Sequence, residues 1–478
     1  MKDYRTTIGL EVHAELDTTT KMFCSCVNAP HNAEPNTHIC PVCMAHPGTL
    51  PVPNKSAVAH VLRVGTAIGG TIADFSEFDR KSYFYPDIPK GYQISQYKYP
   101  LVMGGELAGV AITRIHLEED TARSSHDGEP GKSIVDFNRA GVPLMELVTE
   151  PVMHDAATAG TFARELQLLL RTLGVSKANL EKGEMRIEAN ISVSATDTPS
   201  TAYVEVKNIN SFRAVERAIA YEVGRQIALL ENGELLVKET RGWDENKQQT
   251  FSQRLKEGAS DYRYFPEPDI PKLFLSEIPE FSGDTLRAGL PELPWEKRSR
   301  YAALGLKLET CAYLADSVAR STFFDRVANV LNTDTALLQI AANYLVSDVA
   351  GWYAKQGEKE EYEGLDPDTF TKLIELIGEG VLSSRGAKDV LLALLEGATE
   401  EPRTIATKAG LIQVSDPEIL LPLVQAVLSS NPEAIAEYRA GKQSSLQFLV
   451  GASIKASNGS GNPTVLRELL AAELGKGT

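Results

Sequence analysis

The sequence is poor in cysteine and tryptophan and contains no long apolar segment. Its 478 residues include five cysteines and three tryptophans. No apolar run approaches the ~18 residues that a transmembrane helix needs, and the first residues, MKDYRTTIGLEVH, have no apolar core of the signal-peptide type. We therefore expect a cytoplasmic protein without a membrane anchor. In such a reducing compartment, clustered thiols bind metal more often than they pair.

Basic side chains are also in deficit. The chain has 48 Lys and Arg against 64 Asp and Glu, which gives a net charge of −16. This balance argues against DNA binding, and it excludes RNA binding through bulk positive charge, so any RNA contact must use local basic surface. The last 78 residues carry seven side chains of each sign and would repel a polyanion least.

Histidine is missing from the last two thirds of the chain, where helical periodicity dominates instead. Up to about residue 290, strand-like runs alternate with two helices, one entered at Asp155 and stopped at Gly174, the other from Ser211 to Gly233. The following LPELPWEKR, with Pro291 and Pro294, is typical of a linker. We predict an α+β domain and two small helical domains, at residues 1–292, 293–408 and 409–478.

Four of the five cysteines lie in one segment, residues 22–46. Cys24 and Cys26 form C-x-C, and after thirteen residues Cys40 and Cys43 form C-x-x-C. Four thiolates at this spacing can close a tetrahedron around zinc and leave no position for a substrate, so such a zinc is structural. The alternative is four thiols without metal. Cys311 stands alone in a helical stretch and is interpreted as a buried, inert thiol.

Three strand-like runs carry carboxylates and imidazoles. In IGLEVHAEL, apolar residues alternate with polar ones, so Glu11 and His13 share a face. In AITRIHLEED, alternation separates Glu118 from Glu119, and it places Arg114, His116, Glu118 and Asp120 on one face. PLMELVTEP adds Glu146 and Glu150. If these strands meet, their side chains form an oxygen-rich site suited to Mg²⁺; otherwise each is a solvated polar face.

Several longer motifs carry a resemblance to a known family. They are IGLEVHAEL, FDRKSYFYPDIPKGYQISQY, RIHLEEDTA, VDFNRAGVPLMELVTEP, EVKNINSF, ETRGWDE, DYRYFPEPDIP and LQFLVGASIKASNGSGNPTVLRELL. Over its whole length the chain resembles the GatB family, the B subunits of aspartyl/glutamyl-tRNA(Asn/Gln) amidotransferases. The last of these motifs resembles the tail that this family shares with small YqeY-like proteins.

The resemblance implies both a fold and a reaction. The family fold resembles glutamine synthetase, with a curved, mainly antiparallel sheet that forms a cradle, followed by two small all-α domains. The family uses ATP to phosphorylate the side-chain carboxylate of Glu-tRNA(Gln) or Asp-tRNA(Asn), and ammonia then displaces the phosphate. The implied cofactors are ATP, Mg²⁺ and a structural Zn²⁺. The sequence does not choose between the two charged tRNAs.

The resemblance also assigns roles to residues. The implied catalytic residues are Glu11, His13, Lys81, Glu119, Glu146, Arg186 and Glu188. The implied Mg²⁺ ligands are Glu11, His13, Glu118, Glu119 and Glu146, with the choice between Glu118 and Glu119 left open. The candidate tRNA phosphate contacts in the YqeY-like tail are Arg439, Lys442, Lys455 and Arg467, each of which is also compatible with an ordinary solvated helix charge. Lys81 is either a lining residue of an ammonia channel or a surface lysine.

The chain has no motif that could generate ammonia. It contains no Ser-Ser-Lys amidase pattern and no G-x-S-x-G elbow. The resemblance therefore implies a heterotrimer with the glutaminase subunit GatA and the small subunit GatC. Two alternatives remain: a stand-alone ammonia ligase of the glutamine-synthetase type, and a non-catalytic, zinc-stabilised RNA-binding protein.

Overall fold

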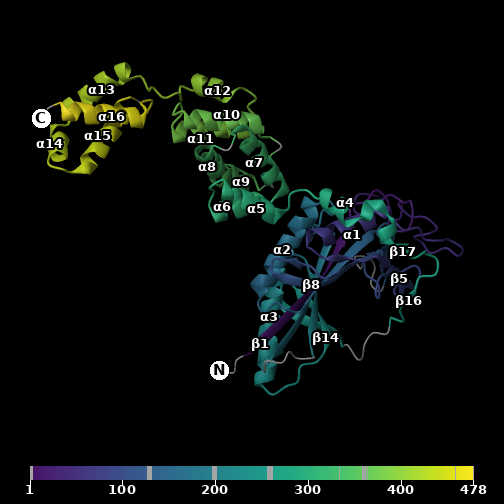
Figure 1. Ribbon diagram of the computed structural model, residues 1–478. Helices are drawn as coiled ribbons and strands as arrows, with labels where there is room; N and C mark the ends of the chain where they lie inside the picture. Colours follow the sequence, from purple (N-terminus) through teal and green to yellow (C-terminus); the bar gives the residue numbers. More distant parts are fainter. Residues whose placement is uncertain are drawn as a thin grey trace. The chain divides into compact units, whose positions relative to one another are not determined.

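The chain forms two compact units, Met1–Leu293 and Pro294–Thr478. The structure, a computed structural model (Figure 1), describes residues 4–125, 132–195, 202–255, 262–332, 334–357, 362, 364–457 and 459–476. The boundary between the units lies inside the predicted linker. Pro294 nevertheless begins a helix, because the fixed φ of proline suits a first helical turn, so residues 295–298 of that linker are helical.

A large mixed sheet dominates the first unit. Its neighbours follow the order β15-β14-β13-β12-β1-β11-β8-β6-β2, with β7 paired to β8. Among the described pairs, β13–β14 is parallel and the others are antiparallel. The strands are β1 (Arg5–Glu15), β2 (Thr71–Ile72), β6 (Val102–Met103), β7 (Glu106–Leu107), β8 (Val110–Glu119), β11 (Pro143–Thr149), β12 (Met185–Ser194), β13 (Val204–Ile209), β14 (Glu239–Asp244) and β15 (Gln249–Leu255). The predicted mixture of sheet and helix is thereby confirmed.

Strand β1 shows why this sheet has one apolar and one polar face. Ile8, Leu10, Val12 and Ala14 are all at most 1% exposed, whereas Glu11 and His13 alternate with them and remain partly open. Period-two alternation places the two sets on opposite faces, as predicted. The sequence therefore builds a core on one side of β1 and a polar surface on the other.

Helices pack against this sheet, and two of them begin at residues that the sequence indicated. The predicted caps are confirmed: Asp155 accepts a hydrogen bond from the Thr158 N–H at α2 (Ala156–Thr172), and Ser211 accepts one from Ala214 at α3 (Phe212–Glu231). Helix α3 packs on β12, β13 and β15 and against α2, while α1 (Lys55–Ala67) packs on β2, β6 and β8. Shorter helices follow at η1 (Leu275–Glu277), η2 (Pro279–Phe281) and α4 (Gly283–Ala288).

Three small sheets complete the first unit. One is ordered β16-β4-β5 and consists of β16 (Phe265–Pro266), β4 (Asp79–Ser82) and β5 (Tyr92–Ser95). The other two pair β9 (Arg123–Ser125) with β10 (Ile134–Asp136), and β17 (Leu273–Phe274) with β3 (Phe75–Ser76). The sheet β16-β4-β5 matters for the site, because β5 contacts β8.

The second unit is helical in its described part and holds two hydrophobic clusters. The first cluster runs from Tyr301 to Ala406 and the second from Leu420 to Leu474. The first is built by α5 (Pro294–Ala303), α6 (Leu308–Ala315), α7 (Val318–Val330), α8 (Thr335–Tyr344), η3 (Leu345–Val349), α9 (Ala350–Gln356), α10 (Pro367–Gly378), α11 (Ser384–Leu395) and α12 (Pro402–Lys408). The second is built by α13 (Pro417–Ser430), α14 (Pro432–Arg439), α15 (Gln443–Ala456) and α16 (Pro463–Gly475). Cys311 is buried in the first cluster, as predicted.

Taken singly, no helix in the described residues has the length and apolar character needed to cross a membrane. The pair α13 and α14, bent by 89°, meets these criteria only when both helices are counted together.

Candidate active site and metal centre

Four neighbouring strands bring four functional side chains into one row. His13 on β1 lies opposite Arg186 on β12 and opposite Glu146 on β11, and Glu146 in turn lies opposite His116 on β8. All four face the same cleft. The three strand-like runs that the sequence singled out are therefore adjacent, and their polar faces coincide.

Two carboxylates and two imidazoles meet at the centre of this row. The Nε2 atom of His13 lies 3.3 Å from Glu146 Oε2 and 3.8 Å from Glu118 Oε1. The Nε2 atom of His116 lies 3.3 Å from Glu146 Oε2 and 3.6 Å from Glu118 Oε2. Ser95 on β5 donates a further hydrogen bond of 2.8 Å to Glu118. One oxygen or nitrogen from each of His13, Glu118 and Glu146 lies within 4.8 Å of the others, which is a spacing that one cation could bridge.

The two imidazoles and the two buried carboxylates shift one another's pKa values. Burial opposes a charge on His116, but Glu146 and Glu118 raise its pKa to about 9. Glu146 likewise raises the pKa of His13 against the effect of burial. Burial alone would raise the pKa of Glu146, yet the positive charge of His116 holds it well below its usual range. The two carboxylates therefore favour positive charge between them, which a divalent cation would supply in place of the imidazole protons.

A second carboxylate group adjoins the first. Glu11 lies opposite Glu188 in the β1–β12 register, and a ligand atom of each lies within 4.8 Å of one on Glu205. Lys207 pairs with Glu188 at 2.8 Å and with Glu205 at 3.4 Å, while Asn190 donates a hydrogen bond of 2.7 Å to Glu11. Burial, with the charges of Glu146 and Glu188, raises the pKa of Glu11.

Both groups line one polar cleft of about 1090 Å³ that also contains Lys81 and Arg186. Arg186 donates two hydrogen bonds to Asp120, of 2.9 and 3.1 Å. Although burial favours the neutral acid, Arg186 and Arg139 lower the pKa of Asp120 to about 2. Burial opposes the charge of Lys81, but the charges of Glu118 and Glu146 raise its pKa above the ordinary value. Both cations therefore stay charged and face the carboxylates.

Of the residues implied as catalytic or as Mg²⁺ ligands, Glu119 is the one that does not line this cleft. Its side chain points to the other face of β8, where Lys90 pairs with it at 2.6 Å and the Ile94 N–H donates to it at 3.0 Å. It lines a separate cavity of about 270 Å³. The structure thus gathers Glu118, and not Glu119, with His13 and Glu146.

The cleft residues that were not assigned to the site from the sequence include His116, Asp120, Glu205 and Lys207. The alternation in AITRIHLEED did place the first two on the face of Glu118, which was the available signal. The last two come from β13, whose run TAYVEVKNIN alternates Val204 and Val206 with Glu205 and Lys207, so the same signal was available there. The four tail cations Arg439, Lys442, Lys455 and Arg467 lie in the second unit, where Lys442 pairs with Glu437 at 2.9 Å.

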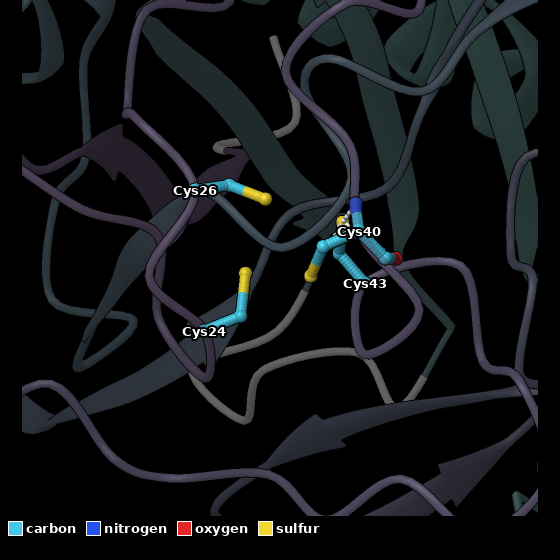
Figure 2. A group of neighbouring side chains, drawn as sticks. All are labelled: Cys24, Cys26, Cys40 and Cys43. Atoms are coloured by element: carbon cyan, nitrogen blue, oxygen red, sulfur yellow. Dashed lines mark hydrogen bonds between the residues drawn. The ribbon is translucent and has the colours of Figure 1, made fainter.

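The four clustered cysteines form a separate group that could hold a metal ion. Figure 2 shows their sulfur atoms turned toward a common centre, and all four lie within 4.8 Å of one another. The Sγ atoms of Cys40 and Cys43 are 3.8 Å apart. Two sulfurs bound to one zinc in a tetrahedron lie about 3.8 Å apart, so the donor set and its spacing fit Zn²⁺.

A buried lysine provides an independent test of that fit. Lys21 is 0% exposed, and its Nζ lies 3.8 Å from Cys43 Sγ and 3.2 Å from the Phe137 carbonyl oxygen. Burying an ammonium group is costly unless negative charge compensates it. Four thiolates around Zn²⁺ carry a net charge of −2, which a neighbouring ammonium group offsets. Lys21 therefore matches a metal-bound tetrathiolate better than four neutral thiols.

Comparison with known proteins agrees with these features. Residues 6–278 match the family model described as "GatB/GatE catalytic domain", and residues 323–474 match the model described as "GatB domain". A protein from Thermus thermophilus, named as the B subunit of aspartyl/glutamyl-tRNA(Asn/Gln) amidotransferase, is 43% identical over 478 residues, covering 99% of this chain and all of that protein. A protein of the same name from Thermomicrobium roseum is 45% identical over 98% of each chain.

A plant protein is similar over the same length. The glutamyl-tRNA(Gln) amidotransferase B subunit of Physcomitrium patens, named as chloroplastic/mitochondrial, is 43% identical over 98% of this chain and 85% of its own.

Proposed function

The chain belongs to the GatB family, and from this premise we propose that it is the B subunit of a glutamine-dependent tRNA amidotransferase. It phosphorylates the side-chain carboxylate of Glu-tRNA(Gln), Asp-tRNA(Asn) or both, and then amidates the product. The observation that carries this proposal is the His13, Glu118 and Glu146 triad in a large polar cleft. Such a site suits phosphoryl transfer, whose transition state needs charge neutralisation more than covalent help.

The chemistry explains why the cleft contains both signs of charge. A free carboxylate offers only oxide as a leaving group, so one of its oxygens first attacks the γ-phosphorus of ATP and ADP departs. Ammonia then attacks the acyl carbon, inorganic phosphate leaves, and the nitrogen loses a proton. Lys81 and Arg186 would orient the anionic carboxylate and phosphate groups, because both face the cleft as cations.

Magnesium, when bound, supplies positive charge that neutralises and aligns the transferring phosphate. We propose that His13, Glu118 and Glu146 hold it, since their ligand atoms converge. Glu11 and Glu188 belong to the second group, with Glu205, and would accept a further cation or orient one through water. Glu119 is left out of this ligand set because it pairs with Lys90 instead.

The remaining parts of the proposal concern architecture and partners. The sheet, antiparallel in all but one described pair, would form a glutamine-synthetase-like cradle whose polar face holds the nucleotide. Zinc would hold Cys24, Cys26, Cys40 and Cys43 and act structurally. Ammonia would come from a glutaminase of the GatA type, held in a heterotrimer with a small GatC-type protein, because the chain carries no nucleophile motif of an amidase.

Reconstitution tests the proposal. The chain, assembled with glutaminase and small subunits, receives ATP, glutamine and either Glu-tRNA(Gln) or Asp-tRNA(Asn). We expect ADP and an amidated aminoacyl-tRNA to form in equal amounts with at least one of them. ATP-dependent fixation of ammonia on free glutamate would instead indicate a stand-alone ligase. Binding of tRNA without ATP turnover would indicate a non-catalytic RNA-binding protein.

A further inference from the structure

A group of tyrosines lines the same cleft as the carboxylates. Among the described lining residues, the aromatic ones are Tyr83, Tyr97, Tyr262 and Tyr264, which we call the tyrosine platform. The roles proposed above for the triad and for the two cations Lys81 and Arg186 do not involve these rings. Their position next to Lys81, whose Nζ lies 5.1 Å from the Tyr262 ring centre, puts them beside the reacting groups.

The small sheet β16-β4-β5 gathers the platform from distant parts of the chain. Tyr83 directly follows β4, Tyr97 follows β5, and Tyr262 and Tyr264 precede β16. The rings of Tyr97 and Tyr264 are stacked, with centres 4.5 Å apart and planes inclined by 13°. Tyr262 meets Tyr264 and Tyr83 edge to face, at 6.0 and 5.9 Å. The platform is therefore one continuous aromatic surface.

Much of this surface is open. Tyr97 is 61% exposed although it is stacked on one side, so the stack ends on an uncovered ring. Beyond Tyr83 the aromatic surface continues to Tyr85, whose ring centre lies 6.0 Å away and which is 56% exposed. Such exposure of several large rings marks a binding surface more than a folding element.

Cations accompany the exposed rings. Lys81 and the exposed Arg263 also line the cleft, and Lys98, next to Tyr97, is exposed. Aromatic rings on which bases stack, set beside cations that meet the phosphates, are the means by which proteins bind unpaired nucleic-acid strands. A mononucleotide offers one base, whereas the rings here extend out of the cleft as a run that suits several successive bases.

We propose that the tyrosine platform binds the unpaired 3′ end of the charged tRNA, with its terminal adenine stacked on Tyr97. This inference rests on the proposed function. The amino acid is esterified to the terminal ribose, so when its side chain reaches the triad, the terminal base lies only an ester and a sugar away. The platform is the aromatic surface that the described cleft offers at that place.

Kinetics of the assembled three-subunit enzyme provide the first test. Stacking of one base is worth a factor of about ten to one hundred, so we expect Tyr97→Ala to lower kcat/KM for charged tRNA by that factor. The KM for ATP should stay within about twofold. Tyr97→Phe, which keeps the ring, should restore the wild-type value. Tyr221→Ala, which removes a partly exposed tyrosine of α3 outside the cleft lining, is the matched control.

A direct optical readout separates stacking from general damage. A tRNA carrying 2-aminopurine as its terminal base should lose fluorescence on binding the wild-type and Tyr97→Phe enzymes, and should keep it with Tyr97→Ala. A raised KM for ATP with normal tRNA kinetics would overturn the inference and reassign the ring to nucleotide binding. Loss of subunit association in Tyr97→Ala would overturn it in favour of a protein interface.

The two proposals fail in different ways. A wild-type complex that amidates neither charged tRNA defeats the proposed function. A wild-type complex that amidates, together with a Tyr97→Ala complex of equal kcat/KM and equal quenching, defeats the platform alone.

Discussion

His13 is the imidazole that we propose as a ligand in the triad, and its Nε2 lies 3.8 Å from Glu118 and 3.3 Å from Glu146. Replacing it with alanine leaves Glu118 and Glu146 to hold the cation without a nitrogen donor. We expect His13→Ala to lower amidation by the assembled enzyme about a thousandfold or more. Charged-tRNA affinity should stay within a few-fold, because the base and phosphate contacts lie elsewhere. Rapid-quench kinetics and filter binding measure the two quantities.

Glu150→Gln provides the control for that substitution. Glu150 follows β11 and accepts a hydrogen bond of 2.8 Å from Thr113, but it does not line the cleft. A glutamine oxygen can accept the same bond, so amidation should be normal. Activity of His13→Ala near that of Glu150→Gln would contradict the assignment of the triad.

Asp120 gives the site a predictable response to acid. Its pKa is lowered from 3.8 to about 2, so its ion pairs with Arg186 and Arg139 contribute stability above pH 3.8 that is lost as the pH falls through 2. This shift corresponds to about 2 kcal/mol. We therefore expect Asp120→Asn to lower the free energy of unfolding by at least about 2 kcal/mol at pH 7.

Urea unfolding of the first unit measures this effect. The fluorescence of Trp243, which is buried in this unit, follows the unfolding when Trp295 and Trp352 are replaced by phenylalanine. The difference between Asp120→Asn and the parent should be constant above pH 4 and should shrink below it. A difference that grows as the pH falls would contradict a stabilising ion pair at Asp120.

At the scale of elements, alternation in the strands was enough to predict which residues share a face. Glu11 with His13, and His116 with Glu118, were placed correctly because a side chain's face depends only on its position along the strand. The choice between Glu118 and Glu119 was not predictable. It depends on which face of β8 the rest of the fold covers, and that is set by distant segments.

The contacts between elements could not be predicted from the sequence either. The pairing of β1 with β11 joins Glu11 to Val148, and no periodicity records such a partner. Lys21 was missed because a lysine usually indicates surface, whereas here it is buried against Cys43. The clustering of the four cysteines was predictable, since their spacing is local.

The cysteine segment has few backbone ladders in its described residues, so metal would replace secondary structure as its support. We expect one zinc per chain, and we expect Cys40→Ser to lower stability or solubility more than turnover per folded molecule. Zinc content by mass spectrometry and thermal unfolding test this. Metal-free protein of full stability would contradict it.

Lys21→Met tests the counter-ion within the same segment. Loss of the ammonium group leaves the tetrathiolate charge uncompensated, so zinc should transfer to a colorimetric chelator about tenfold faster or more. Lys55→Met, which removes a lysine that is 62% exposed, should release zinc at the wild-type rate. Equal rates of zinc release from the two variants would contradict the role of Lys21 as a counter-ion.

At the scale of the whole molecule, the last helices form a removable part. Helices α13 to α16 enclose their own cluster around Leu420, Leu449 and Leu466, separate from the cluster that ends at Ala406. Truncation after residue 412, which keeps Leu411 and Ile412 packed against the first cluster, should therefore leave the other cores intact. We expect a higher apparent KM for tRNA and a weaker salt dependence, because the candidate phosphate contacts of the tail would be lost. Unchanged tRNA binding across a salt series would contradict this.

The row that joins Arg186, His13, Glu146 and His116 limits how the gene for this chain can change in length. A one-residue insertion or deletion in any of the four strands would turn that strand's contribution toward the apolar side. A two-residue change would keep the side chain on the same face of the sheet but move it along the strand, away from its partners in the row. Insertions and deletions in descendants of this gene should therefore spare these strands and accumulate between them, while point substitutions remain possible within them.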